Sequence, residues 1–162
     1  MTIESPSAAA TIAGLAIALT TLCPPLEAQA PSLAGTWHPE VYVMKDGTRR
    51  TVDGLMFFSP THWTALFFIV EEGEIERGAG EGGAYSLEGT RLVLRHQYHL
   101  SAGRALPHVP RTDPLRMDAR SPAEATEEVC VIAFEAGRLR IDFPSGNHMV
   151  FRRAADSAAA IR

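Results

Sequence analysis

The stretch Leu33-Ala34-Gly35-Thr36-Trp37 opens the first β-prone segment of this 162-residue chain. A glycine two residues before a tryptophan, at the first strand of an all-β sequence, predicts a small barrel closed at one end by an aromatic plug. The stretch bears on architecture rather than on chemistry. Candidate chemistry has to be sought in the strands that follow it.

The first 30 residues differ in composition from the rest of the chain. The apolar run 8–23 is too short to span a bilayer, and it is followed by Pro24-Pro25 and the small-residue pattern Ala28-Gln29-Ala30. We therefore expect residues 1–30 to be a signal peptide, 31–153 to form one barrel domain, and 154–162 to be a short tail. The expected location is extracytoplasmic, secreted or periplasmic, with no membrane insertion after signal removal.

Charge and cysteine content narrow the class of partner. After removal of residues 1–30, 15 Lys and Arg residues stand against 17 Asp and Glu residues, a net charge of −2. Such a balance provides no electrostatic footprint for nucleic acid. Cys130 is then the single cysteine, so an intramolecular disulfide is excluded and core burial has to stabilise the domain.

Short β-prone runs alternate with Gly, Pro and Asp punctuation, which is typical of a sandwich or barrel. We expect eight strands, at 35–44, 55–58, 62–70, 83–87, 91–100, 127–134, 138–143 and 147–152. A helical turn is expected only within 121–125. In an up-and-down order, the connections at one barrel end are then tight, whereas those at 45–54, 71–82 and 101–126 are long. This asymmetry predicts a cup with one mouth and room for one small ligand.

Side-chain alternation distinguishes the inner from the outer face of the expected strands. In strand 91–100 one face carries Leu92, Leu94, His96, Tyr98 and Leu100, and the other face is mainly polar. Strand 62–70 is apolar on both faces. Its outer face is therefore either covered, by a loop or by a second subunit through self-association, or left as an exposed apolar surface.

The chain resembles the calycin superfamily, in particular the bacterial lipocalin-like domains. The matching motifs are Leu33–Trp37, Gly82-Gly83-Ala84-Tyr85-Ser86 and Phe151-Arg152-Arg153, spread over nearly the whole barrel domain. The resemblance implies an eight-stranded antiparallel up-and-down barrel, with Trp37 as the plug and Arg152 packed over its indole. The Thr-Asp-Tyr signature of typical lipocalins is replaced by Glu135-Ala136-Gly137, so the resemblance implies the fold rather than a transport function.

Two motifs are assigned to structure rather than to chemistry. The segment Gly78-Ala79-Gly80-Glu81-Gly82-Gly83 matches G-x-G-x-x-G, but it does not lie between a strand and a helix, so we interpret it as a mouth loop. His96 and His99 are three residues apart on one strand and are expected on opposite faces, which argues against a shared metal ion. We expect no metal and no cofactor, and Cys130 is interpreted as an inert buried thiol.

The strongest candidate site combines His96, Tyr98 and Glu128. All three are expected to project inward near the mouth, where His96 would accept a proton, Glu128 would orient it, and Tyr98 would donate to a ligand carbonyl or phenol. The alternative is a hydrated polar cluster without a chemical role. His148 is a further candidate, and Phe68 and Phe143 are the phenylalanines expected to line the cup.

The function that these observations favour is an exported barrel that binds a small apolar or amphipathic molecule without catalysis. A competing hypothesis is a small barrel enzyme of the isomerase, cyclase or lyase type that uses the His/Tyr/Glu cluster. A third is a structural or interaction module that uses the outer face of strand 62–70.

Overall fold

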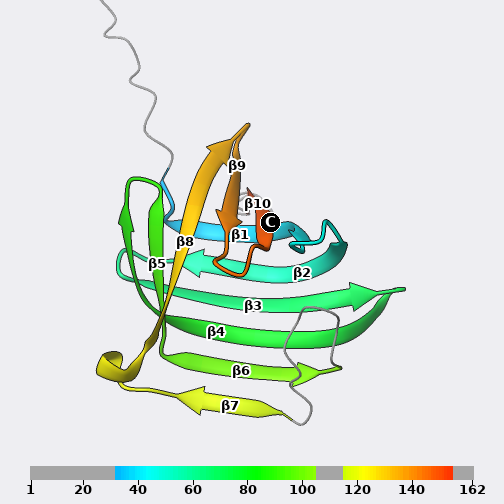
Figure 1. Ribbon diagram of the computed structural model, residues 1–162, viewed down its shortest axis with the longest axis horizontal. Helices are drawn as coiled ribbons and strands as arrows, with labels where there is room; N and C mark the ends of the chain where they lie inside the picture. The colour runs from blue at the N-terminus through cyan, green and yellow to red at the C-terminus, as the bar shows by residue number, and fades with distance from the viewer. Residues whose placement is uncertain (1–31, 105–114, 155–162) are drawn as a thin grey trace, which may run out of the picture. The chain divides into compact units, whose positions relative to one another are not determined.

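The computed structural model describes residues 32–104 and 115–154 of the chain, and these form an antiparallel barrel (Figure 1). The predictions for residues 1–30 and for the tail beyond residue 154 lie outside the described residues. The strands are β1 (Gly35–Val43), β2 (Arg49–Phe58), β3 (His62–Glu71), β4 (Glu74–Glu88), β5 (Arg91–His96), β6 (Tyr98–Gly103), β7 (Arg116–Ala119), β8 (Thr126–Glu135), β9 (Arg138–Asp142) and β10 (His148–Arg153).

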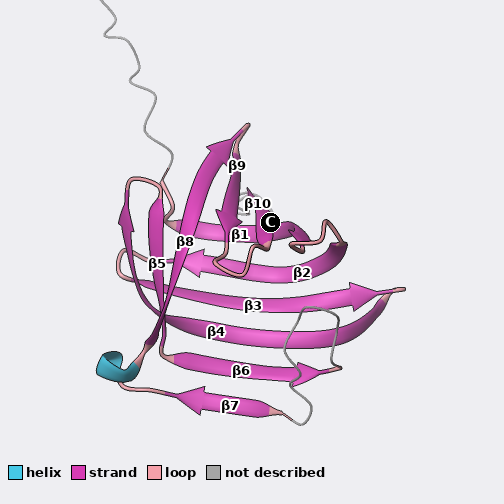
Figure 2. Cartoon of the chain, in the orientation of Figure 1, coloured by secondary structure: helices cyan, strands magenta, loops and turns pink. Residues whose placement is uncertain are grey.

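Eight of these strands close the barrel. They follow one another as β1, β2, β3, β4, β5, β8, β9 and β10, and β10 pairs with β1. All of these pairings are antiparallel between neighbours in this order, so the predicted eight-stranded antiparallel up-and-down barrel is confirmed. The described residues contain one helical turn, η1 (Pro122–Glu124), within the segment where it was expected (Figure 2). No helix among them is long and apolar enough to cross a membrane.

The prediction of a long acidic loop at 71–82 is wrong, because β4 runs through most of it. Only a two-residue turn, Glu72-Gly73, separates β3 from β4. The glycine-rich sequence pairs along β3 from Glu74 to Ala84, and its outer positions lie under β3 side chains, as Gly78 does beside Phe68. The strand was not predicted because its sequence is rich in glycine and charged residues, which are depleted in strands on average. β2 is also longer than predicted, so the connections expected to be long at 45–54 and 71–82 are short.

The predicted strand 91–100 is interrupted at Gln97. β5 and β6 both pair with β4, but β5 continues to β8, whereas β6 leaves the barrel wall and pairs with β7. β7 was not predicted. Gly83 lies opposite the interruption, where a Cβ would sit 2.0 Å from the carbonyl oxygen of Arg95, so only glycine allows the two backbones to approach this closely.

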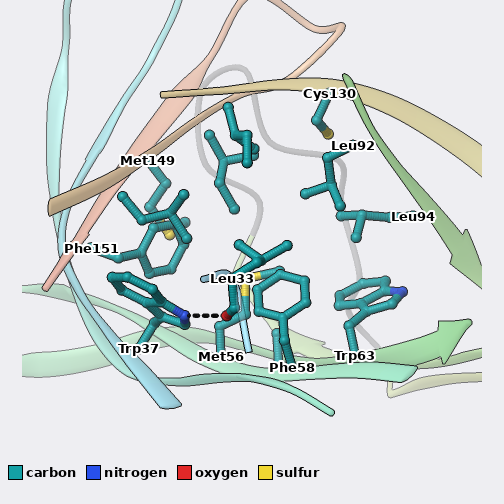
Figure 3. Packing of buried hydrophobic residues seen from close by; sticks show 14 of the residues in the cluster. Leu33, Trp37, Met56, Phe58, Trp63, Leu92, Leu94, Cys130, Met149 and Phe151 are labelled. Atoms are coloured by element: carbon teal, nitrogen blue, oxygen red, sulfur yellow. Dashed lines mark hydrogen bonds between the residues drawn. The ribbon is translucent and has the colours of Figure 1, made fainter. Parts of the chain in front are cut away.

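The apolar core fills one end of the barrel around Trp37 (Figure 3). Trp37 is buried, and its indole Nε1 donates a hydrogen bond of 2.8 Å to the carbonyl oxygen of Leu33. The core also contains Phe58, Leu92 and Phe151. The residue predicted to be the plug is therefore a buried core residue whose N–H is paired locally.

The cation over the plug is Arg153, and the prediction of Arg152 for this role is wrong. The Arg153 guanidinium carbon lies 4.5 Å from the centroid of the Trp37 ring, and its nitrogens donate to the carbonyl oxygens of Ala34, at 2.9 Å, and of Ser32. Arg153 shares the inner face of β10 with the buried Phe151, whereas Arg152 lies on the alternate face. Gly35, at φ +121°, leaves space for Arg153, because a Cβ there would lie 2.8 Å from its Nη1.

Arg153→Gln is expected to lower the free energy of unfolding by about 1–2 kcal/mol, because the cation–π contact and the hydrogen bonds to carbonyl oxygens are lost. Arg152→Gln is the matched control and should change it by less than about 0.5 kcal/mol. Urea unfolding followed by tryptophan fluorescence measures both. Equal losses for the two variants would contradict the assignment of Arg153.

Candidate functional site

A cavity of about 380 Å³ lies inside the barrel beyond the core. Its wall is largely apolar and is made by Val52, Met56, Trp63, Ala65, Phe67, Ile69, Ala79, Leu94, Phe143 and Met149. The polar lining side chains are Tyr42, Arg77, Glu81, His96, His99, Arg116, Glu128 and Ser145. The volume and the mixture of an apolar wall with a few polar groups are those of small-molecule sites.

A more open hollow of about 450 Å³ shares part of this wall. The shared residues are Glu81, His96, His99, Arg116 and Glu128, and the remaining lining comes mainly from β7, β8 and the segment between them. The hollow is therefore a polar vestibule beside the apolar cavity. The shared charged residues form the boundary between the two.

His96 is held between two carboxylates from different strands. Its Nδ1 lies 3.0 Å from Oε2 of Glu81 on β4, and its Nε2 lies 3.3 Å from Oε2 of Glu128 on β8. Glu81 also reaches Nδ1 of His99 at 2.9 Å, and Nε2 of His99 lies 2.7 Å from Oγ of Ser101. The cluster thus links β4, β5, β6 and β8 where β5 and β6 separate.

The two carboxylates make His96 a cation at neutral pH. Burial on its own would lower the pKa of His96, but the hydrogen bonds to Glu128 and Glu81 outweigh it and raise the pKa to about 9. Burial would likewise raise the pKa of Glu81, yet the bonds to His96 and His99 hold that pKa below its usual value. His96 was predicted to be a proton acceptor beside one carboxylate, Glu128. The structure adds a second carboxylate, Glu81, which the prediction had placed in a loop, and His96 is therefore already protonated.

Three of the residues predicted for the cavity line it, namely His96, Glu128 and Phe143. The prediction that Tyr98 points inward is wrong. Tyr98 is 59 % exposed, because the extra residue at Gln97 reverses the alternation of inward and outward side chains. The same reversal turns His99 inward, so His96 and His99 both contact Glu81, against the prediction of opposite faces.

Phe68 does not line the cavity, and the prediction that it does is wrong. Phe67 takes that position, because it shares the inward alternation of β3 with the buried Trp63, while Phe68 packs beside Gly78 on the outer face. His148 is partly buried on β10, paired in register with Asp142, and does not line the cavity or the vestibule.

Sequence reasoning missed Glu81, Tyr42 and Arg77 as cavity residues. Glu81 and Arg77 carried a usable signal, because they alternate with glycines over 77–82 as inward residues of a strand do. Among residues 32–104 and 115–154, no group of three or more His, Cys, Asp or Glu side chains is arranged to hold a metal ion. Cys130 is fully buried, and its burial raises the pKa of the thiol to about 12.

Comparison with solved structures finds similarity at low sequence identity. A lipocalin-like protein from Bacteroides uniformis matches 75 % of this chain and 98 % of its own, with 20 % sequence identity and a TM-score of 0.47. No protein-family model matches the chain, and no curated protein matches it in sequence. The strand order of the chain is that of a closed, eight-stranded, antiparallel up-and-down barrel, which is the fold class that the resemblance implied.

The pKa of His96 makes the stability of the barrel depend on pH. Because the folded pKa of about 9 lies above the ordinary 6.5, the stabilisation is complete below pH 6.5 and is lost as the pH rises through 9. His96→Gln should therefore be less stable than the wild type at pH 6, by about 1–2 kcal/mol after allowance for solvent screening. This difference should shrink by pH 10 in urea titrations.

The control is His62→Gln, because His62 is exposed on the outside of the barrel, where its Nδ1 lies 2.8 Å from the hydroxyl oxygen of Thr61. Its stability relative to the wild type should not vary between pH 6 and pH 10. A constant difference between His96→Gln and the wild type over the same range would show that His96 is not held as a cation.

Proposed function

We propose that this barrel binds a small apolar or amphipathic molecule in its cavity. The proposal rests on the cavity of about 380 Å³, whose wall has ten apolar side chains. Five of its eight polar lining side chains lie on the side that it shares with the vestibule. Burial of apolar ligand surface favours binding but does not fix the orientation of the ligand, because the hydrophobic effect is not directional. The polar groups would orient one end of the molecule.

Binding without catalysis is supported by the state of the polar cluster. Both ring nitrogens of His96 are engaged by carboxylates, and the imidazole carries its proton at neutral pH. A general base has to offer a free lone pair to its substrate, which this arrangement withholds. The tyrosine expected to assist it, Tyr98, lies on the outer face.

Filling the cavity should abolish binding. Ala79 lines the cavity from β4, so Ala79→Trp should weaken binding of the neutral fluorophore N-phenyl-1-naphthylamine at least tenfold, as measured by fluorescence titration. The same substitution at Ala119, which is exposed on β7, is the control and should leave binding within twofold of the wild type. Failure of the wild type to bind the fluorophore, or equal binding by both variants, would contradict a ligand site in the cavity.

An acid–base enzyme is the second candidate, because an imidazole between two carboxylates faces the cavity. His96 would then act as an acid, since it is protonated at neutral pH. The two functions separate in His96→Gln. Loss of turnover of a bound compound with binding retained would establish the enzyme, whereas the binding function expects no turnover in either protein.

We also propose self-association through the outer face of β3 and its neighbours. Register partners place Leu55, Leu66, Gly80, Leu100 and Met117 in one row across β2, β3, β4, β6 and β7. The four larger side chains of this row are exposed. A contiguous apolar face of this kind is typical of a protein interface, and a two-fold pairing would cover it on both copies.

Leu66→Glu should convert a dimer into a monomer, because it places a charge at the centre of this face. Val131→Glu is the matched control, since Val131 is exposed on β8, outside the row. Sedimentation velocity over a concentration series distinguishes the states. A wild-type protein that stays monomeric at high concentration would remove this proposal without affecting the cavity.

A further inference from the structure

We propose that the polar end of the ligand is an uncharged hydrogen-bond acceptor, a carbonyl oxygen of the ketone, ester or lactone kind, held by the Tyr42 hydroxyl and the Trp63 indole N–H. This inference rests on the proposed binding function and names the ligand chemistry that the cavity selects. Both residues line the cavity, and both offer hydrogen-bond donors.

The Tyr42 hydroxyl has a proton left to donate. Asn147 fixes its role, because the Asn147 Oδ1 accepts from the backbone N–H of Lys45 at 2.9 Å, so its amide NH₂ faces Tyr42 and donates to the hydroxyl oxygen at 2.9 Å. The hydroxyl oxygen is therefore an acceptor in that pair. Within 32–104 and 115–154, no hydrogen bond is donated by the hydroxyl itself.

The Tyr42 ring is also held in place. It packs edge-on against Phe143, with ring centroids 6.3 Å apart and planes at 84°. Burial raises the pKa of Tyr42, so the hydroxyl keeps its proton at physiological pH. A rigid, protonated phenol on a cavity wall is a preorganised donor.

The Trp63 indole N–H is the second donor. Trp63 is 4 % exposed, and its Nε1 is buried without a hydrogen-bond partner among the residues that the structure describes. In Figure 3 this nitrogen points away from the neighbouring core side chains. The adjacent His96 ring, at 5.0 Å between centroids, does not accept its proton, because both imidazole nitrogens are engaged by Glu81 and Glu128. An indole N–H can only donate, so its natural partner is a ligand acceptor.

Charge balance favours a neutral ligand. The lining holds two cations, Arg77 and His96, and two carboxylates, Glu81 and Glu128, so the formal charges of these four groups cancel. Glu81 interacts electrostatically with both cations, and Glu128 bonds to His96. The remaining charged side chain, Arg116, is largely exposed and is paired with Asp118. A ligand carboxylate would approach two carboxylates and a ligand ammonium would approach two cations, and neither would recover the cost of leaving water.

The test is competition against N-phenyl-1-naphthylamine by three molecules of equal chain length at pH 7.5, namely 2-undecanone, undecanoate and undecylamine. The ketone should displace the fluorophore at a concentration at least tenfold lower than the carboxylate or the amine. Tighter binding of the carboxylate or of the amine would overturn the inference. Fluorophore binding with displacement by none of the three would overturn it as well, while leaving the proposed function intact.

Tyr42→Phe keeps the ring and removes only the hydroxyl. It should weaken binding of the ketone at least three times more than it weakens binding of the fluorophore, because only the ketone offers a carbonyl oxygen to the hydroxyl. Tyr98→Phe is the matched control, because Tyr98 is on the outer face, and it should change neither affinity. Equal ketone binding by the wild type and Tyr42→Phe would overturn the role of the hydroxyl.

Infrared spectroscopy of ¹³C-carbonyl-labelled 2-undecanone provides a readout that a merely structural role would not move. The carbonyl band of the bound ketone should lie at lower frequency in the wild type than in Tyr42→Phe, and a further shift is expected in Trp63→Phe. Identical bands in all three proteins would show that neither donor reaches the carbonyl. Failure of the wild type to bind the fluorophore would instead remove the proposed function, and this inference with it.

Discussion

The extra residue at Gln97, opposite the close backbone approach at Gly83, determines most of what is distinctive in this barrel. It lets β5 remain in the barrel wall beside β8 while β6 turns away to pair with β7. The insertion is stabilised by backbone bonds, since the N–H of Gln97 donates to Gly82 at 3.0 Å and its carbonyl accepts from Arg120 at 2.8 Å. Because an inserted residue reverses the side-chain alternation, one position decides which side chains face the cavity beyond it.

The charged cluster occupies the place where the barrel wall divides. Glu81 on β4 receives His96 from β5 and His99 from β6, while Glu128 reaches His96 from β8. These hydrogen bonds therefore connect β5 and β6 where the two strands separate. These ion pairs are partly buried, so removing one partner leaves a charge with reduced access to water. The cluster also lies between the apolar cavity and the polar vestibule.

β3 is apolar on both faces, and each face has a different consequence. Its inward side chains, Trp63, Ala65 and Phe67, form cavity wall, whereas Leu66 belongs to the exposed apolar row. The outer face is flatter beside this row, because the glycines of β4 have no side chains there. Ligand binding and self-association would therefore use opposite faces of the same strands and place separate demands on their sequence.

The sequence by itself determined the all-β class, the up-and-down order of the strands and the place of Trp37 in the core. These follow from local alternation, turn residues and one well-placed aromatic, which are properties of neighbouring residues. It also predicted that His96 and Glu128 point inward, because the side-chain alternation is regular up to each of these residues. Tyr98, Phe68 and Arg152 were assigned to the wrong face, by a bulge in the first case and by a one-residue choice of alternation in the others. Only the tertiary structure brought Glu81 and His99 to His96 and left donors on Tyr42 and Trp63, because those relations depend on the register between strands distant in sequence. A one-residue change of register exchanges the inner and outer faces of a strand, and no local pattern records it.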